Sequence, residues 1–143
     1  MKIKRNAFVD WQGGLKDGKG TISTESGALK GYPYGFAARF EGLRGSNPEE
    51  LIAAAHASCF TMAMSMILSE ANLKAEHIET SAEVILEKVE TGFAITSVHL
   101  NLNAKIPNTD QATLEKLSAM AKQGCPVSKL IKAPITFDVV LIS

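Results

Sequence analysis

The stretch that decides the fold is residues 47–71, which read NPEELIAAAHASCFTMAMSMILSEA. Ser46 or Asn47 can cap a helix, Pro48 suits the first helical position, and the two acidic residues that follow favour the first turn. Alanine, leucine and methionine then continue without a break. Because the segment is apolar on nearly every face, we expect a long helix buried at the centre of the fold.

On both sides of this helix the sequence predicts shorter elements. Alternation and turn signals favour strands on each side. The two strands after the helix are expected to form a hairpin with its turn at residues 90–92. Two further helices are expected before a last strand. The expected strands are 2–11, 20–24, 34–41, 80–88, 93–106 and 135–142, and the expected further helices are 110–123 and 126–130. This order predicts an α+β fold with antiparallel sheets packed around the central helix, formed by residues 1–143 as a single domain.

Composition narrows the class of function. Hydrophobic residues make up 45% and charged residues 21%, which is typical of a globular protein, and 15 basic residues balance 15 acidic ones. A net charge of zero disfavours nucleic acid as a partner. The charged residues at the N-terminus are not followed by the apolar core of a signal peptide, and the apolar run 51–68 is interrupted by polar residues. We therefore expect a cytoplasmic protein that does not span a membrane.

The sequence holds two cysteines, Cys59 and Cys125. Cys59 lies near the middle of the central helix, where a cysteine is often simply a small apolar core residue. Cys125 precedes Pro126 at a predicted helix start, and such a position lowers the pKa of a thiol. In a reducing compartment two such cysteines are catalytic, redox-active or inert rather than a permanent cross-link. The spacing alone does not choose among these.

A reactive thiolate at Cys59 needs a cation from elsewhere in the fold, because about eleven residues, or roughly 16 Å, separate it from the start of its own helix. Arg39 is the best candidate, since it lies among apolar residues in a predicted strand and needs a carboxylate partner there. The near carboxylates are Glu41, Glu49 and Glu50. The side chains expected to line an apolar substrate pocket beside the thiol are Tyr34, Phe36, Phe40 and Met62.

His56 raises two other hypotheses. It shares a helix face with Cys59, so the two residues and Cys125 can be imagined as a zinc site, or His56 as the base of a Cys–His nucleophile. Only three ligands are available in an apolar setting, and no oxyanion-hole motif follows Cys59. The sequence therefore disfavours both a metal and a hydrolase.

Residues 47–60 resemble the central-helix signature of the osmotically inducible protein C and organic hydroperoxide resistance superfamily. Gly124-Cys125-Pro126-Val127-Ser128 is similar to its second cysteine motif. The resemblance covers essentially the whole chain, and the Ala-Arg39-Phe-Glu-Gly segment is similar to the osmotically inducible protein C branch. The resemblance implies an intertwined homodimer with active sites at the subunit interface, without metal or organic cofactor.

The resemblance also implies a chemistry. Cys59 attacks an organic hydroperoxide, or less efficiently hydrogen peroxide, and becomes a sulfenic acid, which Cys125 converts to a Cys59–Cys125 disulfide. Arg39 stabilises the thiolate and Glu49 holds Arg39. A dithiol, in this family a lipoylated protein, restores the thiols. The alternative is a non-enzymatic domain that binds an apolar ligand or senses oxidation.

One expectation concerns the distance between Glu49 and Cys59. Glu49 and Cys59 are about ten residues, or roughly 15 Å, apart along one straight helix. A single Arg39 can hardly contact both within one chain. We therefore expect Glu49 to reach the site from the partner subunit.

Overall fold

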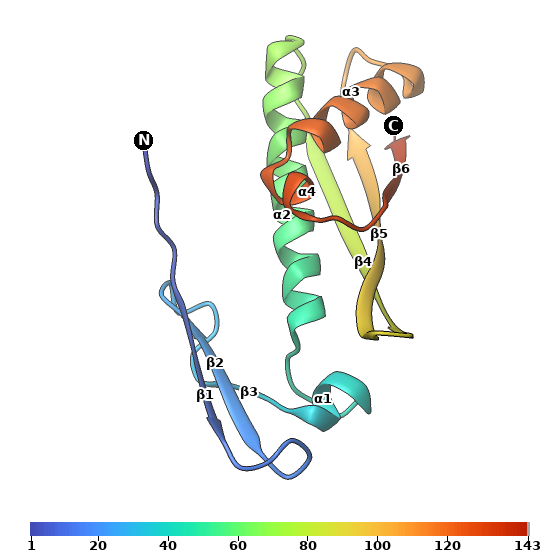
Figure 1. Ribbon diagram of the computed structural model, residues 1–143. Coiled ribbons are helices and arrows are strands. Elements are labelled where there is room, and N and C mark those ends of the chain that lie inside the picture. Colours follow the sequence, from blue (N-terminus) through green and yellow to red (C-terminus); the bar gives the residue numbers. More distant parts are fainter. Residues whose placement is uncertain (143) are drawn as a thin grey trace. The chain divides into compact units, whose positions relative to one another are not determined.

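The computed structural model describes residues 1–142 (Figure 1). The chain divides into two compact units, the first comprising Met1–Leu51 and the second beginning at Ile52. The expectation of a single domain stays a prediction. Each unit has its own three-stranded sheet, so each is described by itself.

The N-terminal unit is built on a three-stranded antiparallel sheet followed by a short helix. Its strands are β1 (Ala7–Gln12), β2 (Lys19–Thr24) and β3 (Tyr32–Tyr34), paired in that order. The sequence placed the start of the first strand too early, at residue 2. The second strand was predicted within one residue.

Residues 36–40 form helix α1 (Phe36–Phe40), so the predicted strand over 34–41 is wrong beyond Tyr34. The backbone N–H of Arg39 donates to the carbonyl of Gly35 at 3.1 Å, which is a helical bond. The rings of Phe36 and Phe40 lie one helical turn apart with their centroids at 5.0 Å. The same apolar spacing that reads as alternation in a strand also satisfies an i, i+4 contact, and that contact stabilises the helix.

The C-terminal unit combines a second sheet with three helices. Its strands are β4 (His77–Val89), β5 (Gly92–Lys105) and β6 (Ile135–Ile142), and its further helices are α3 (Gln111–Gly124) and α4 (Pro126–Leu130). The β4–β5 pair is the predicted hairpin, with Val89 opposite Gly92. The prediction of purely antiparallel sheets is wrong, because β5 and β6 pair in parallel. A parallel pair needs a crossover connection, and α3 and α4 supply it.

Helix α2 (Pro48–Glu70) starts as the sequence predicts. Asn47 caps it, its side-chain oxygen accepting from the backbone N–H of Glu50 at 2.8 Å, and the Ser46 hydroxyl donates to the Glu50 carboxylate at 2.9 Å. Capping satisfies backbone N–H groups that have no partner inside the helix. The helix is the long green ribbon of Figure 1.

The burial of α2 differs from the expectation. A line of side chains at four-residue spacing, His56, Phe60, Met64 and Leu68, is buried, while Met62 is 76% exposed. Among residues 1–142, α2 is the one helix long and apolar enough to cross a membrane by length and composition, yet only 22% of its most apolar stretch is buried within the chain. The expected all-round burial is therefore wrong for a single chain, because the sheet and α3 cover one face only.

The core of the C-terminal unit lies where α2, α3 and the sheet meet. It is a continuous apolar cluster of buried residues from α2, β5, α3 and β6, and it includes Cys125. In β6 the pattern alternates, with Val139 buried in this cluster and its neighbour Val140 48% exposed. A strand has a side-chain period of two, so the core decides which face of β6 points inward.

This register yields a stability test. Val139→Ala should lower the free energy of unfolding by about 2 kcal/mol, because it removes two buried methyl groups and leaves a cavity. Val140→Ala is the matched control and should cost less than about 0.5 kcal/mol. Denaturant unfolding of both variants gives the comparison. Equal losses would contradict the assigned register.

Candidate active site

Cys125 is placed where α3 ends and α4 begins. Its backbone N–H donates to the carbonyl of Ala121 at 2.9 Å, and its sulfur accepts from the backbone N–H of Ser128 at 3.5 Å as the cap of α4. The predicted position at a helix start is confirmed. The residue is 0% exposed, so its sulfur is reached only from inside the unit.

Cys59 contacts this sulfur from α2. Both cysteines are free thiols, Cys59 packs against the core cluster that contains Cys125, and a hydrogen bond joins the two side chains. Cys59 is half-buried whereas Cys125 is fully buried. The structure therefore brings together two residues far apart in the sequence, as a redox pair requires.

The two thiols have opposite pKa shifts. Burial raises the pKa of Cys59, and the hydrogen bond and negative charge of Cys125 raise it further. Burial also raises the pKa of Cys125, but hydrogen bonds from Cys59, from the Ser128 hydroxyl and from the backbone N–H groups of Ser128 and Val127 outweigh burial and lower it. Within one chain, these groups therefore favour ionisation of Cys125 over ionisation of Cys59.

A pocket of about 450 Å³ opens at Cys59. Its lining is largely apolar and comes from α2, the end of α3 and the start of α4: Ser58, Cys59, Met62, Ala63, Met66, Gly124 and Pro126. Met62, predicted for the substrate pocket, lies here. The other predicted pocket residues, Tyr34, Phe36 and Phe40, belong to β3 and α1 of the N-terminal unit. The half-buried thiol is thus open to an apolar molecule of modest size.

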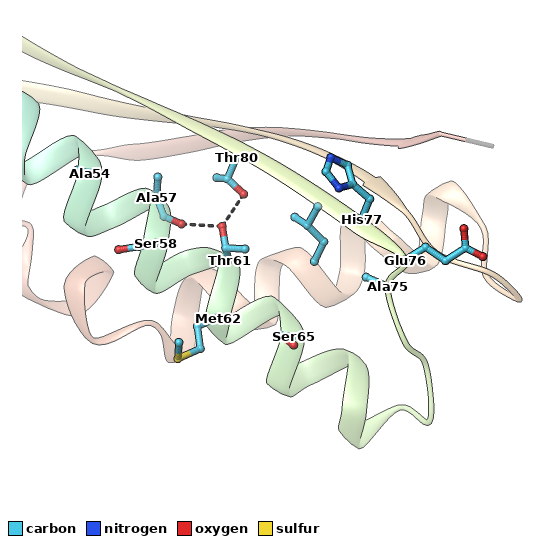
Figure 2. Close-up of a pocket in the computed structure, with 11 residues that line it drawn as sticks. Ala54, Ala57, Ser58, Thr61, Met62, Ser65, Ala75, Glu76, His77 and Thr80 are labelled. Atoms are coloured by element: carbon cyan, nitrogen blue, oxygen red, sulfur yellow. Dashed lines mark hydrogen bonds between the residues drawn. The ribbon is translucent and has the colours of Figure 1, made fainter.

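A larger groove of about 770 Å³ lies between α2 and β4 (Figure 2). The Thr61 hydroxyl lies in this groove, 2.7 Å from the carbonyl of Ala57 and 2.6 Å from the hydroxyl of Thr80. Met62 borders both the pocket and the groove, but neither Cys59 nor Cys125 lines the groove. Size therefore does not identify the reactive site in this unit, whereas the position of the thiols does.

Arg39 and Glu49 form an ion pair in the N-terminal unit. The Nε and Nη2 atoms of Arg39 both donate to Oε1 of Glu49, at 3.1 and 2.7 Å, and the guanidinium lies over the ring of Phe40 at 5.2 Å. The side chain of Glu49 is only 11% exposed and that of Arg39 38%. A charge-assisted bond of this kind fixes the guanidinium while leaving it accessible.

Arg39 and Glu49 pair within one chain, so if Glu49 reaches the Cys59 site from the partner subunit, Arg39 comes with it; that expectation stays a prediction. It rests on the roughly 15 Å of helix between Glu49 and Cys59. The helical turn of α1 presents Arg39 to the start of α2, where Glu49 lies.

His56 has a different role from the zinc ligand or base considered above. It is 0% exposed, and its Nε2 atom lies 2.7 Å from the Ser128 hydroxyl. Burial lowers the pKa of His56, so the ring is neutral. Sequence reasoning missed Ser128 as a site residue. The signal was present, because Ser128 stands three residues after the cap Cys125, where a side chain returns towards the cap.

These features define a class: an α+β protein with two hydrogen-bonded thiols, one open to an apolar pocket and one buried at a helix start. The chain belongs to the OsmC-like protein family, which it matches over residues 41–140. It is 51% identical over 138 residues to peroxiredoxin OsmC of Escherichia coli strain K12, covering 96% of each chain. It is 30% identical over 97 residues to organic hydroperoxide resistance protein-like 2 of Staphylococcus epidermidis, covering 66% of each.

Solved structures agree with this assignment. The organic hydroperoxide resistance protein OhrB of Bacillus subtilis superposes with a TM-score of 0.72 at 30% identity, over 96% of this chain and 98% of that one. An OsmC-like protein of Vibrio cholerae has a TM-score of 0.76 at 19% identity, over 97% and 100% of the two chains. The second likeness shows the fold alone.

The difference in exposure of the two thiols gives a labelling prediction. Brief treatment of the reduced, folded protein with iodoacetamide should alkylate Cys59 well before Cys125, because only Cys59 opens to the pocket. Peptide mass spectrometry measures both sites, and denatured protein, in which both thiols react, is the control. Earlier labelling of Cys125 would contradict the placement of the sulfurs.

Proposed function

We propose that this protein is a thiol-dependent peroxidase that reduces organic hydroperoxides, and hydrogen peroxide less efficiently. The observation that carries the proposal is the hydrogen-bonded pair Cys59–Cys125, with Cys59 open to an apolar pocket. The printed names of the relatives, a peroxiredoxin and organic hydroperoxide resistance proteins, support the same chemistry.

The reaction follows from the two sulfurs. The Cys59 thiolate attacks the distal peroxide oxygen, the O–O bond breaks, and the alkoxide leaves and takes a proton to become the alcohol, so that Cys59 becomes a sulfenic acid. The Cys125 thiolate then attacks the Cys59 sulfur, forming the disulfide and displacing hydroxide, which takes up a proton from the solution to become water. An external dithiol, of the lipoylated-protein class, reduces the disulfide by exchange. No metal or organic cofactor enters these steps.

The charge on Cys59 requires a further group. Within one chain, burial and Cys125 raise the pKa of Cys59, so a cation is needed to favour its thiolate. Arg39, held by Glu49, is that cation in our proposal, and it also stabilises charge developing on the peroxide oxygens. Because roughly 15 Å of helix separates Glu49 from Cys59, we infer that the ion pair of one chain serves Cys59 of a second copy.

A homodimer also accounts for the exposed face of α2. Met62 and Met66 are 76% and 56% exposed on a helix that is apolar almost all round, and a second copy would remove such side chains from water. Bringing the pocket and the ion pair together then completes the site. We place this dimer in the cytoplasm, where dithiol reductants keep the cysteines reduced.

The roles of the sulfurs are separable by substitution. Cys59→Ser should abolish consumption of cumene hydroperoxide, because no sulfenic acid can form. Cys125→Ser should allow one turnover and then stop in the presence of dihydrolipoamide, because no disulfide is made for the dithiol to reduce. Full turnover by Cys59→Ser would end the enzyme proposal and leave an apolar-ligand or redox-sensing domain.

Arg39 should be irreplaceable by lysine. Arg39→Lys keeps a positive charge but loses the two-atom contact with Glu49, so kcat/KM should fall about 10²-fold. Glu49→Gln should cause a similar loss. Arg44→Gln, an exposed arginine close by in the sequence, is the matched control and should leave the rate within about twofold.

Co-expression tests which copy supplies the guanidinium. A hybrid of Cys59→Ser chains and Arg39→Gln chains contains one complete site only if Arg39 acts across the dimer. Activity of the hybrid well above that of either parent is the expected result. Hybrids as inactive as their parents would refute the shared site.

A further inference from the structure

Two pairs of residues, each with a three-residue helical spacing, face each other at the thiols. On α2, His56 and Cys59 are three residues apart and share a face, and at the start of α4 Cys125 and Ser128 have the same spacing. His56 contacts Ser128 at 2.7 Å, and Cys59 contacts Cys125. The site therefore has two neighbouring side-chain contacts between α2 and the start of α4. The mechanism above uses only the contact between the two sulfurs.

Ser128 connects these two contacts. Its backbone N–H donates to the Cys125 sulfur at 3.5 Å, its hydroxyl makes a further hydrogen bond to that sulfur, and the same hydroxyl contacts His56 Nε2. A hydroxyl has one proton to donate. If that proton goes to the sulfur, His56 must donate to the serine oxygen from Nε2.

The remaining ring nitrogen supports this direction. His56 Nδ1 is buried without a hydrogen-bond partner among the described residues. With the proton on Nε2, the atom left alone is a lone-pair acceptor. With the opposite tautomer it is an N–H donor, and buried donors without partners are the rarer of the two. The ring is neutral because burial lowers the pKa of His56, so it acts as an oriented dipole.

We propose that His56 and Ser128 are positioning residues for the resolving step, forming a buried donor chain from His56 Nε2–H through the Ser128 hydroxyl to the Cys125 sulfur. The chain holds Cys125 as a thiolate aimed at Cys59, ready to displace hydroxide from the sulfenic acid. This inference rests on the proposed peroxidase function and assigns a part of its site to the second half of the cycle.

In this proposal hydrogen bonds, rather than a nearby cation, stabilise the Cys125 thiolate. The titratable groups around Cys125 are Cys59 and, through the Ser128 hydroxyl, His56, both from α2, and its other polar contacts are Ser128 and the Val127 backbone of α4. The buried apolar residues of the same cluster from α3, β5 and β6 are Leu114, Leu117, Ala121, Leu100, Leu102 and Val139. Lys122 and Lys129 line a hollow with Ser128, but neither contributes to the lowered pKa of Cys125. Hydrogen-bond donors therefore offset the cost of burying a thiolate there.

The first experiment measures the thiolate directly. In a Cys59→Ser background, where Cys125 is the one thiol, ultraviolet thiolate absorbance is followed against pH with Ser128 present or replaced by alanine. Loss of the hydroxyl should move the Cys125 titration upward by about one pH unit. Ser118→Ala is the matched control, since Ser118 is also a fully buried hydroxyl but has no hydrogen-bond partner among residues 1–142, and it should not move the titration.

The second experiment follows the cycle with both cysteines present. After one equivalent of cumene hydroperoxide, Ser128→Ala should still oxidise Cys59 to the sulfenic acid but should form the disulfide roughly tenfold more slowly at neutral pH, with recovery at higher pH. His56→Leu should act in the same direction. His56→Gln, which retains a donor near the Nε2 position, should restore most of the rate.

The outcomes separate the two proposals. A Cys125 titration and a disulfide rate that are unchanged in both Ser128→Ala and His56→Leu would overturn the donor chain while leaving the peroxidase intact. Absence of any Cys59 oxidation, together with a shifted Cys125 titration, would overturn the peroxidase and leave the donor chain standing. Equal defects in His56→Gln and His56→Leu would reduce His56 to packing.

Discussion

The hydrogen bond between Cys59 and Cys125 is the interaction on which the rest of the site depends. Two thiols in contact in a largely apolar setting do not ionise equally, and here the donors around Cys125 lower its pKa, whereas burial and Cys125 raise the pKa of Cys59. Reactivity at Cys59 therefore requires a second charge from outside the pair. The Arg39–Glu49 ion pair, whose guanidinium is fixed yet accessible, meets this requirement in our proposal.

The same logic divides the cycle between two sets of groups. A cation favours the thiolate on Cys59 for attack on the peroxide, whereas neutral donors favour the thiolate on Cys125 for closure of the disulfide. Once Cys59 is a sulfenic acid it no longer competes for the charge. The His56–Ser128 contact then acts on the sulfur that remains to react. Burial makes each of these hydrogen bonds matter more than it would in water.

Much of the chain was predictable because its signals are local. The cap at Asn47, the length of α2, the 90–92 hairpin turn, the helix after Cys125 and the last strand all depend on residues a few positions apart. The errors have the same origin. The spacing of Phe36 and Phe40 fits both a strand and a helix, and the parallel pairing of β6 depends on where a crossover returns the chain. The role of Ser128 depended on a contact with a residue 72 positions away.

The sequence by itself determined most of the element types, the two candidate sulfurs, the choice of Arg39 and the family resemblance that singled out Glu49, because these follow from residue type and short motifs. Only the tertiary structure decided that Cys59 meets Cys125, that Arg39 binds Glu49 of its own chain, and that His56 is joined to Ser128. Those contacts link segments distant in the sequence. Their geometry, and hence which sulfur ionises more readily, arises from packing that no local pattern contains.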